Sequence, residues 1–165
     1  MKYPAIQNYI NGKFVNASTS KTMEVISPLD GNLLSTVPMS SAKELDDAVK
    51  AAQAAFPGWS KTPIKERVQV FFRYKFLLEK HLKELAELCS EENGKTYGES
   101  VAEIEKCIEL TEFATSLPQL VQGELLEVSK GVECRTEHVP LGKSARYETD
   151  FPVFTFVFIV LLQQC

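Results

Sequence analysis

The stretch TPIKERVQVFFRYKFLLEKHLKELAELCSEENG, residues Thr62–Gly94, has the clearest periodicity in the chain. Thr62 can cap a helix start, and Pro63 suits the first helical position because its missing N–H costs nothing there. His81 is a predicted break, and Asn93-Gly94 supplies a left-handed stop. The pattern predicts two amphipathic helices packed against a core. Apolar residues recur at steps of three and four on the buried side of these helices: Ile64, Val68, Phe71 and Phe72, then Leu82, Leu85, Ala86 and Cys89.

Helical patterns also flank this stretch. Ser41-Ala42-Lys43-Glu44 has the form of a capping box, in which the serine and the glutamate each bind the backbone of the first turn. Pro57-Gly58 is the predicted stop of that helix, and a further helix is predicted over Glu99–Leu117. The predicted core-facing residues of the first are Leu45, Ala48, Val49, Ala52, Ala55 and Phe56. Those of the second are Val101, Ile104, Ile108, Thr111 and Thr115, widened by Leu110, Phe113 and Ala114.

Strand patterns lie at both ends of these helices. Residues 9–15 predict a hairpin around Asn11-Gly12, and Met23–Ile26 with Leu33–Val37 predict a second one, together a small N-terminal β-meander. Near the end of the chain, Leu125–Val128 and Val132–Thr136 predict a hairpin around Ser129-Lys130-Gly131. The predicted fold is therefore α+β: a meander, three to four amphipathic helices, a β-hairpin and an apolar C-terminal strand.

Composition narrows the range of functions. The chain has 165 residues, 44% of them hydrophobic and 24% charged, which suits a globular protein with a real core. A net charge of −4 without basic runs argues against binding nucleic acid or anionic membranes. No apolar segment follows the first residues, so a cytoplasmic location is expected.

Residues that could carry chemistry are few. The cysteines at 89, 107, 134 and 165 form no C-x-x-C pair, and free thiols in a reducing compartment are expected. Glu99, Glu103 and Glu105 cluster near a helix start; acid–base chemistry is one reading, but the favoured one is a solvated face at the positive end of the helix dipole. We expect no catalytic, cofactor-binding or metal-binding residue in the chain.

Several segments together resemble the start of the aldehyde dehydrogenase family. They are AAFPGW (Ala54–Trp59), KERVQVFFRYKFLLEKHLKELAEL, ENGKT (Glu92–Thr96), INGKFV and SPLDGNLLSTVP. The resemblance runs from about Tyr9 to Gly142 and is greatest to methylmalonate-semialdehyde dehydrogenase. It implies a fragment of the α/β aldehyde dehydrogenase fold. It also implies the family reaction, in which a cysteine thiolate forms a thioester, NAD accepts the hydride, and water or coenzyme A releases the product.

The resemblance carries two further expectations. GVECRTEHVPLG (Gly131–Gly142) is similar to the family's bridging hairpin, which pairs with a segment near the C-terminus and with a neighbouring subunit. A homo-oligomer or a full-length paralogue is therefore the expected partner. In some relatives, a carboxylate near Glu103 and a carbonyl near Ile26 hold a structural monovalent cation.

After Gly142 the family pattern is lost. The family's Asn-Phe-Pro motif, whose amide stabilises the oxyanion, is echoed only by Asp150-Phe151-Pro152, and a carboxylate there would repel an oxyanion. No glycine-rich cofactor loop or general-base glutamate motif is present, and Gln164-Cys165 is not the Gly-Gln-x-Cys nucleophile motif. We therefore expect this chain alone to be inactive and to bind no cofactor, although full-length relatives use NAD and in some cases coenzyme A.

The residues after Gly142 form their own segment. We divide the chain into residues 1–142, the aldehyde dehydrogenase-like part, and residues 143–165, a divergent apolar tail. Phe151–Leu162 carries no charge, and it is too short to span a bilayer as a helix. A buried strand, a self-associating edge and membrane contact are open alternatives, as are a frameshift, alternative splicing and a truncated gene product as its origin. The alternative function is a non-catalytic fragment that self-associates or docks on a full-length paralogue through residues 124–142 and this tail.

Overall fold

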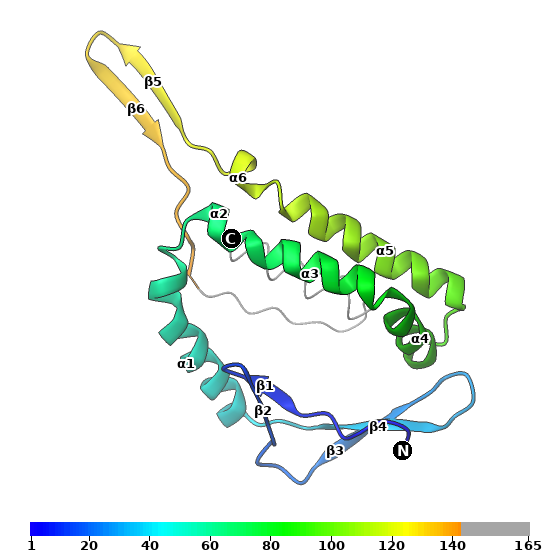
Figure 1. The fold of residues 1–165 in the computed structure, drawn as a ribbon. Coiled ribbons are helices and arrows are strands. Elements are labelled where there is room, and N and C mark those ends of the chain that lie inside the picture. Colours follow the sequence, from blue (N-terminus) through cyan, green and yellow to red (C-terminus); the bar gives the residue numbers. More distant parts are fainter. Residues whose placement is uncertain (143–165) are drawn as a thin grey trace. The chain divides into compact units, whose positions relative to one another are not determined.

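The computed structural model describes residues 1–142, which divide into two compact units (Figure 1). Unit 1 comprises Met1–Trp59 and Leu82–Glu103, and unit 2 comprises, within the described residues, Ser60–His81 and residues 104–142. The predicted strand within residues 151–162 lies outside the described residues. Within residues 1–142, no helix is both long enough and apolar enough to cross a membrane.

Unit 1 begins with two small antiparallel sheets. β1 (Asn8–Ile10) pairs with β2 (Lys13–Val15), and β3 (Thr22–Ile26) pairs with β4 (Leu33–Pro38). Both predicted hairpins are confirmed, and Asn11 at φ 52° adopts the positive φ that the first turn requires. The strands of the predicted N-terminal β-meander form two separate two-stranded sheets, because β2 and β3 do not pair.

The loop between β2 and β3 is held to a helix by hydrogen bonds. Glu44, in the first turn of α1 (Ala42–Trp59), accepts hydrogen bonds from the backbone N–H and the hydroxyl of Ser18 at 2.7 and 2.5 Å. It also accepts from the Ser41 N–H at 2.8 Å and from the Ser41 hydroxyl, which confirms the capping box. These bonds, the Ser18 hydroxyl foremost, hold the pKa of Glu44 far below its ordinary value.

The predicted apolar side of α1 is covered only in part by the described residues, because Ala48 and Phe56 are half-buried and none of the predicted positions is fully buried. Leu45 is 64% exposed and Val49 is 42% exposed, whereas Glu44 is buried. The helix also continues through Pro57 to Trp59, so the predicted stop at Pro57-Gly58 is wrong.

A tight turn joins α4 (Leu82–Asn93) to α5 (Tyr97–Ala114). Gly94 has φ 69° and donates its N–H to the Ser90 carbonyl at 2.9 Å, which confirms the predicted left-handed stop. A Cβ on Gly94 would lie 2.9 Å from Pro28 Cγ, so the turn also packs closely against the loop after β3.

Unit 2 contains α2 (Ile64–Arg67), α3 (Gln69–Lys80), most of α5, and α6 (Leu117–Leu120). Its core is formed by Val68, Phe71 and Ala114, with Ile64, Tyr74, Leu110 and Leu117 packed around them. His81 ends α3 as predicted. The prediction that Phe72 is buried is wrong: it is 50% exposed, because α3 turns the side centred on Phe71 and Leu78 inward.

Two helix boundaries also differ from the predictions. The N-cap residue of α2 is Pro63, with an extended ψ of 142°, so the prediction that Thr62 is the N-cap and Pro63 the first helical residue places the helix start one residue early. α5 ends at Ala114 and α6 begins at Leu117, so the predicted helix over Glu99–Leu117 is two elements. The buried positions of α5 are Ser100, Ile104, Cys107, Thr111 and Ala114, a row only partly shared with the predicted face.

Candidate functional site

The hairpin of unit 2 is exposed along its whole length. β5 (Glu124–Ser129) pairs antiparallel with β6 (Val132–Thr136), and all residues of both strands are exposed. Gly131 in the turn has φ 77°, a conformation that glycine adopts without steric cost. The predicted hairpin is therefore confirmed, and the described residues do not cover either of its faces.

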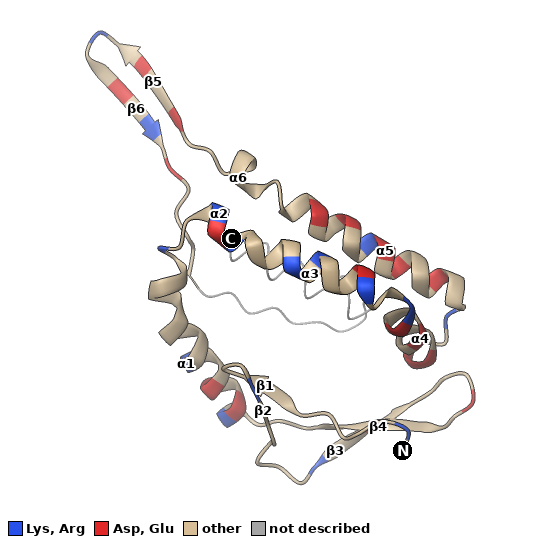
Figure 2. Cartoon of the chain, in the orientation of Figure 1, with Lys and Arg blue, Asp and Glu red and all other residues tan. Residues whose placement is uncertain are grey.

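The two faces of the hairpin differ in polarity. Side chains alternate along each strand, so residues that face each other across the ladder share a side of the sheet. On one side, Glu127 faces Glu133 and Leu125 faces Arg135. The opposite side is less charged around the facing pair Leu126 and Cys134. Figure 2 shows acidic and basic residues interleaved along the hairpin.

One of these cross-strand pairs is unfavourable. Glu127 and Glu133 stand directly opposite each other, and like charges in this position destabilise a strand pair. The Glu127 carboxylate accepts the Gly131 N–H at 3.1 Å. The nearby cation is already paired, because Arg135 Nη2 lies 2.6 Å from Glu137 Oε1. The hairpin thus presents a carboxylate pair that forms no ion pair with a cation of residues 1–142.

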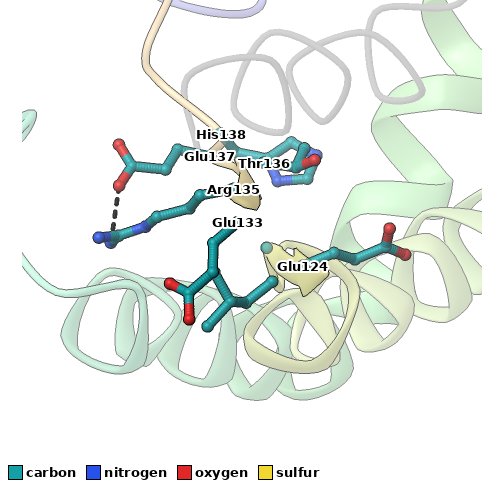
Figure 3. Close-up of a pocket in the computed structure, with 8 residues that line it drawn as sticks. Glu124, Glu133, Arg135, Thr136, Glu137 and His138 are labelled. Carbon is teal, nitrogen blue, oxygen red and sulfur yellow. Dashed lines mark ion pairs between the residues drawn. The ribbon is translucent and has the colours of Figure 1, made fainter. Parts of the chain in front are cut away.

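A hollow of about 720 Å³ lies at the base of the hairpin. It is lined by Gly123, Glu124, Leu125, Glu133, Arg135, Thr136, Glu137 and His138. Figure 3 shows Arg135 and Glu137 extending together on one side, while Glu124 points the other way. Three glutamates in this lining make the hollow a poor receptor for an anionic group such as a phosphate.

A second polar cluster lies within unit 1, around Cys89. Its thiol is 3% exposed and contacts Glu103 Oε2 at 3.5 Å. Glu103 Oε2 also lies 2.6 Å from Lys95 Nζ, and this bond raises the pKa of Lys95. Burial raises the pKa of the Cys89 thiol, and the Glu103 carboxylate raises it further. A buried thiol that resists ionisation is not a nucleophile.

The predicted solvated face of α5 is wrong for Glu103. Its side chain is only 11% exposed and forms the ion pair with Lys95 described above. Glu99 caps the helix by accepting the Thr96 N–H and hydroxyl at 3.0 and 2.8 Å, and Glu105 is exposed. Sequence reasoning missed the Lys95 pairing, although the lysine precedes the carboxylate by only eight positions.

The family resemblance implies a monovalent cation beside a carboxylate near Glu103. In this chain the positively charged Lys95 ammonium donates a hydrogen bond to Glu103 Oε2. In the part of the chain that the structure describes, no group of three or more His, Cys, Asp or Glu could hold a metal ion. Asp150-Phe151-Pro152 and Gln164-Cys165 lie outside the described residues.

Known sequences match most of this chain. The pattern of the Aldehyde dehydrogenase family matches residues 14–146. A malonate-semialdehyde dehydrogenase from Geobacillus kaustophilus (strain HTA426) is 42% identical over 138 residues, which cover 83% of this chain and 28% of that protein. An enzyme of the same name from Bacillus pumilus (strain SAFR-032) is 41% identical over the same shares. The chain therefore spans 28% of the length of each of these two relatives.

Solved structures agree with these sequences. The methylmalonate-semialdehyde dehydrogenase of Oceanimonas doudoroffii has a TM-score of 0.79 at 34% identity, covering 84% of this chain and 28% of that one. A Sinorhizobium meliloti 1021 protein described as a methylmalonate-semialdehyde dehydrogenase, complexed with NAD, has a TM-score of 0.80 at 31% identity, covering 86% and 29%. The helices and small antiparallel sheets are thus a partial aldehyde dehydrogenase fold, and the chain belongs to the aldehyde dehydrogenase family.

Proposed function

We propose that this chain carries the N-terminal scaffold of an NAD-dependent aldehyde dehydrogenase, with a malonate- or methylmalonate-semialdehyde as the substrate class, and that its 165 residues do not catalyse the reaction by themselves. The substrate class is supported by the 42% identity to a malonate-semialdehyde dehydrogenase. A cytoplasmic location fits this class of enzyme.

The catalytic part of the proposal rests on the thiols and their surroundings. The family reaction needs a thiolate, a general base and donors for an oxyanion. Cys89 is buried against the Glu103 carboxylate, whose charge opposes both thiolate formation and an oxyanion nearby. Cys134 is exposed on a hairpin strand and faces Leu126, an aliphatic side chain that provides no oxyanion donor.

The described residues do not fit a dinucleotide. Dinucleotides bind at the carboxyl ends of parallel strands, with the pyrophosphate on a glycine-rich turn and a helix N-terminus. All three sheets in residues 1–142 are antiparallel pairs. The hollow at the hairpin base is lined by Glu124, Glu133 and Glu137, which would repel a pyrophosphate.

The test is an activity assay on the purified chain. Malonate semialdehyde, methylmalonate semialdehyde and propanal are each offered with NAD, with and without coenzyme A, and NADH formation is followed by absorbance. We expect no rate above that of heat-denatured protein, while a full-length relative serves as the positive control. Turnover proportional to the amount of chain, and retained after a second purification step, would contradict the proposal.

A second candidate function is association. We propose that residues 124–142, together with the apolar tail from Lys143 onward, dock on another copy of the chain or on a full-length paralogue. The exposed strands β5 and β6 favour this role, because an uncovered two-stranded hairpin is marginally stable in water. Light scattering should show oligomers, and a chain that ends at Gly142 should show fewer. A monodisperse monomer at high concentration would argue against this role.

A further inference from the structure

We propose that two copies of this chain pair through the outer edges of their β6 strands, antiparallel and about a two-fold axis that passes through Cys134. This inference rests on the proposed self-association and specifies its surface and register. Among residues 1–142, β6 pairs only with β5, so its other edge has no strand beside it. The unpaired N–H and C=O groups of such an edge can pair with a strand of another chain.

The residues of β6 are self-complementary about its centre. Cys134 is the middle residue of the strand Val132–Thr136. A two-fold axis there places Glu133 of one copy opposite Arg135 of the other, and the symmetry repeats this contact. Oppositely charged residues facing each other across an antiparallel ladder stabilise the pairing.

Neighbouring registers lack this match. An axis at Arg135 would place Glu133 opposite Glu137 of the second copy, and an axis at Glu133 would place the two Glu133 side chains against each other. Both arrangements juxtapose like charges, which destabilise a strand pair. The Cys134 axis is therefore the favoured register among these three.

Pairing with a second copy would also stabilise the hairpin itself. Glu133 faces Glu127 within the hairpin, and Arg135 of the second copy would bring a positive charge to this carboxylate pair. Arg135 can be shared because its present ion pair with Glu137 joins side chains that are 73% and 54% exposed, and such surface pairs hold little energy. The strand order β5–β6–β6–β5 would also convert two marginal hairpins into a four-stranded sheet.

Cross-linking tests the register. In the proposed pair the two Cys134 Cα atoms lie about 4.5–5.5 Å apart, within reach of a disulfide. Diamide should therefore couple them: the S–S bond forms, and two protons and two electrons pass to the N=N bond of the reagent. The starting variant is Cys165→Ser, which removes the terminal thiol, and Cys89 and Cys107 are buried. We expect rapid, nearly complete dimer cross-linking on a non-reducing gel.

A matched control places the thiol on the neighbouring strand. Leu126 faces Cys134 on the same side of the hairpin and is also exposed. In a variant with Leu126→Cys, Cys134→Ser and Cys165→Ser, the two thiols would be three strand spacings apart, about 14 Å, and should not cross-link. Cross-linking at 126 but not at 134 would overturn the proposal in favour of pairing through β5.

Charge reversal provides an independent readout. Glu133→Arg places an arginine opposite Arg135 of the second copy twice, and we expect the dimer dissociation constant to rise at least about 10-fold. The hairpin itself should not suffer, because the new arginine faces Glu127. The double variant Glu133→Arg/Arg135→Glu restores opposite charges across the axis and should recover most of the affinity in sedimentation equilibrium.

The outcomes separate this inference from the proposed function beneath it. A dimer that neither cross-links at Cys134 nor responds to charge reversal would refute the β6 register and leave association through another surface. A monomer under all conditions would refute both. Equal weakening by the single and double variants would also refute the register, because it would show that the identity of the facing charge does not matter.

Discussion

Replacing Gly94 by alanine tests the tight turn between α4 and α5. Gly94 has φ 69°, and a left-handed conformation costs a residue with a Cβ about 1–2 kcal/mol. The added Cβ would also lie 2.9 Å from Pro28 Cγ, an atom of a rigid ring, and relieving such an overlap costs about 1–3 kcal/mol. Alanine restricts the unfolded chain and returns about 0.4–1 kcal/mol. The expected net loss of stability is about 2–3 kcal/mol.

Two other glycines of unit 1 separate these contributions. Gly31 has φ 73° and open space around its Cβ position, so Gly31→Ala should cost only the backbone strain, a net loss of about 1 kcal/mol. Gly98 lies inside α5 without positive φ and with open space around it. Gly98→Ala should therefore stabilise the chain by about 0.4–1 kcal/mol, because alanine restricts the unfolded chain.

Urea unfolding followed by the fluorescence of Trp59 measures all three variants. Trp59 is the only tryptophan of the chain, and it belongs to the same unit as the three glycines. With a slope of about 1–3 kcal/mol per molar urea, Gly94→Ala should lower the midpoint by about 1 M. If Gly94→Ala destabilises no more than Gly31→Ala, the close contact with Pro28 is wrong. If Gly98→Ala destabilises as much as Gly94→Ala, the role assigned to positive φ is wrong.

Three further substitutions test the polar contacts and the hairpin base. Lys95→Met leaves the mostly buried Glu103 carboxylate without its ammonium partner and should lower the free energy of unfolding in urea by about 1–3 kcal/mol. Adding Glu103→Gln should recover part of that loss. An equal loss in the single and double variants would contradict the ion pair. The pKa of Glu44 is lowered in the folded state, so its stabilising effect is complete above the ordinary value of 4.5 and is lost as pH falls below it. Thermal unfolding should accordingly show a gap between the parent and Glu44→Gln that is constant from pH 5 to 7 and narrows in acid, and a gap that widens in acid would refute the hydrogen-bonded carboxylate. Gly123→Ala places a Cβ 2.2 Å from the Thr136 carbonyl oxygen and should speed hydrogen exchange across β5 and β6, whereas unchanged exchange would show that the two strand ends do not approach as described.

Local chemistry explains which parts of the fold could be predicted. The turn at Asn11-Gly12, the break at His81 and the stop at Gly94 each depend on the conformational preferences of one or two residues. The capping box at Ser41 and Glu44 depends on a four-residue pattern, and it formed as predicted. Such features can be recognised without knowing what packs against them.

Features that depend on distant residues were not predictable in the same way. The apolar positions of α1 recur at helical spacing, yet Leu45 is exposed. Periodicity shows that one face of a helix is apolar, but it does not show which residues cover that face. Glu44 gained a second partner, Ser18, from a loop 26 positions earlier. Glu103 was misjudged because its partner Lys95 lies in the turn before the helix and not on the helix itself.

The hairpin contains features of both kinds, local ones that could be predicted and long-range ones that could not. Its turn and strands followed from the alternation around Gly131. The direct opposition of Glu127 and Glu133 depends on the register, and a bulge between Glu127 and Ser129 alters the register near the turn. The unfavourable opposition of these two carboxylates, which Arg135 of a second copy would offset in the proposed pair, became apparent only once this register was known.

The most direct test of the central claim, that these residues form an aldehyde dehydrogenase scaffold without a dinucleotide site, is calorimetric titration of NAD into the purified chain. A full-length methylmalonate-semialdehyde dehydrogenase titrated under the same conditions provides the positive control. We predict that the chain gives only heats of dilution. Saturable binding with one NAD per chain would contradict the claim.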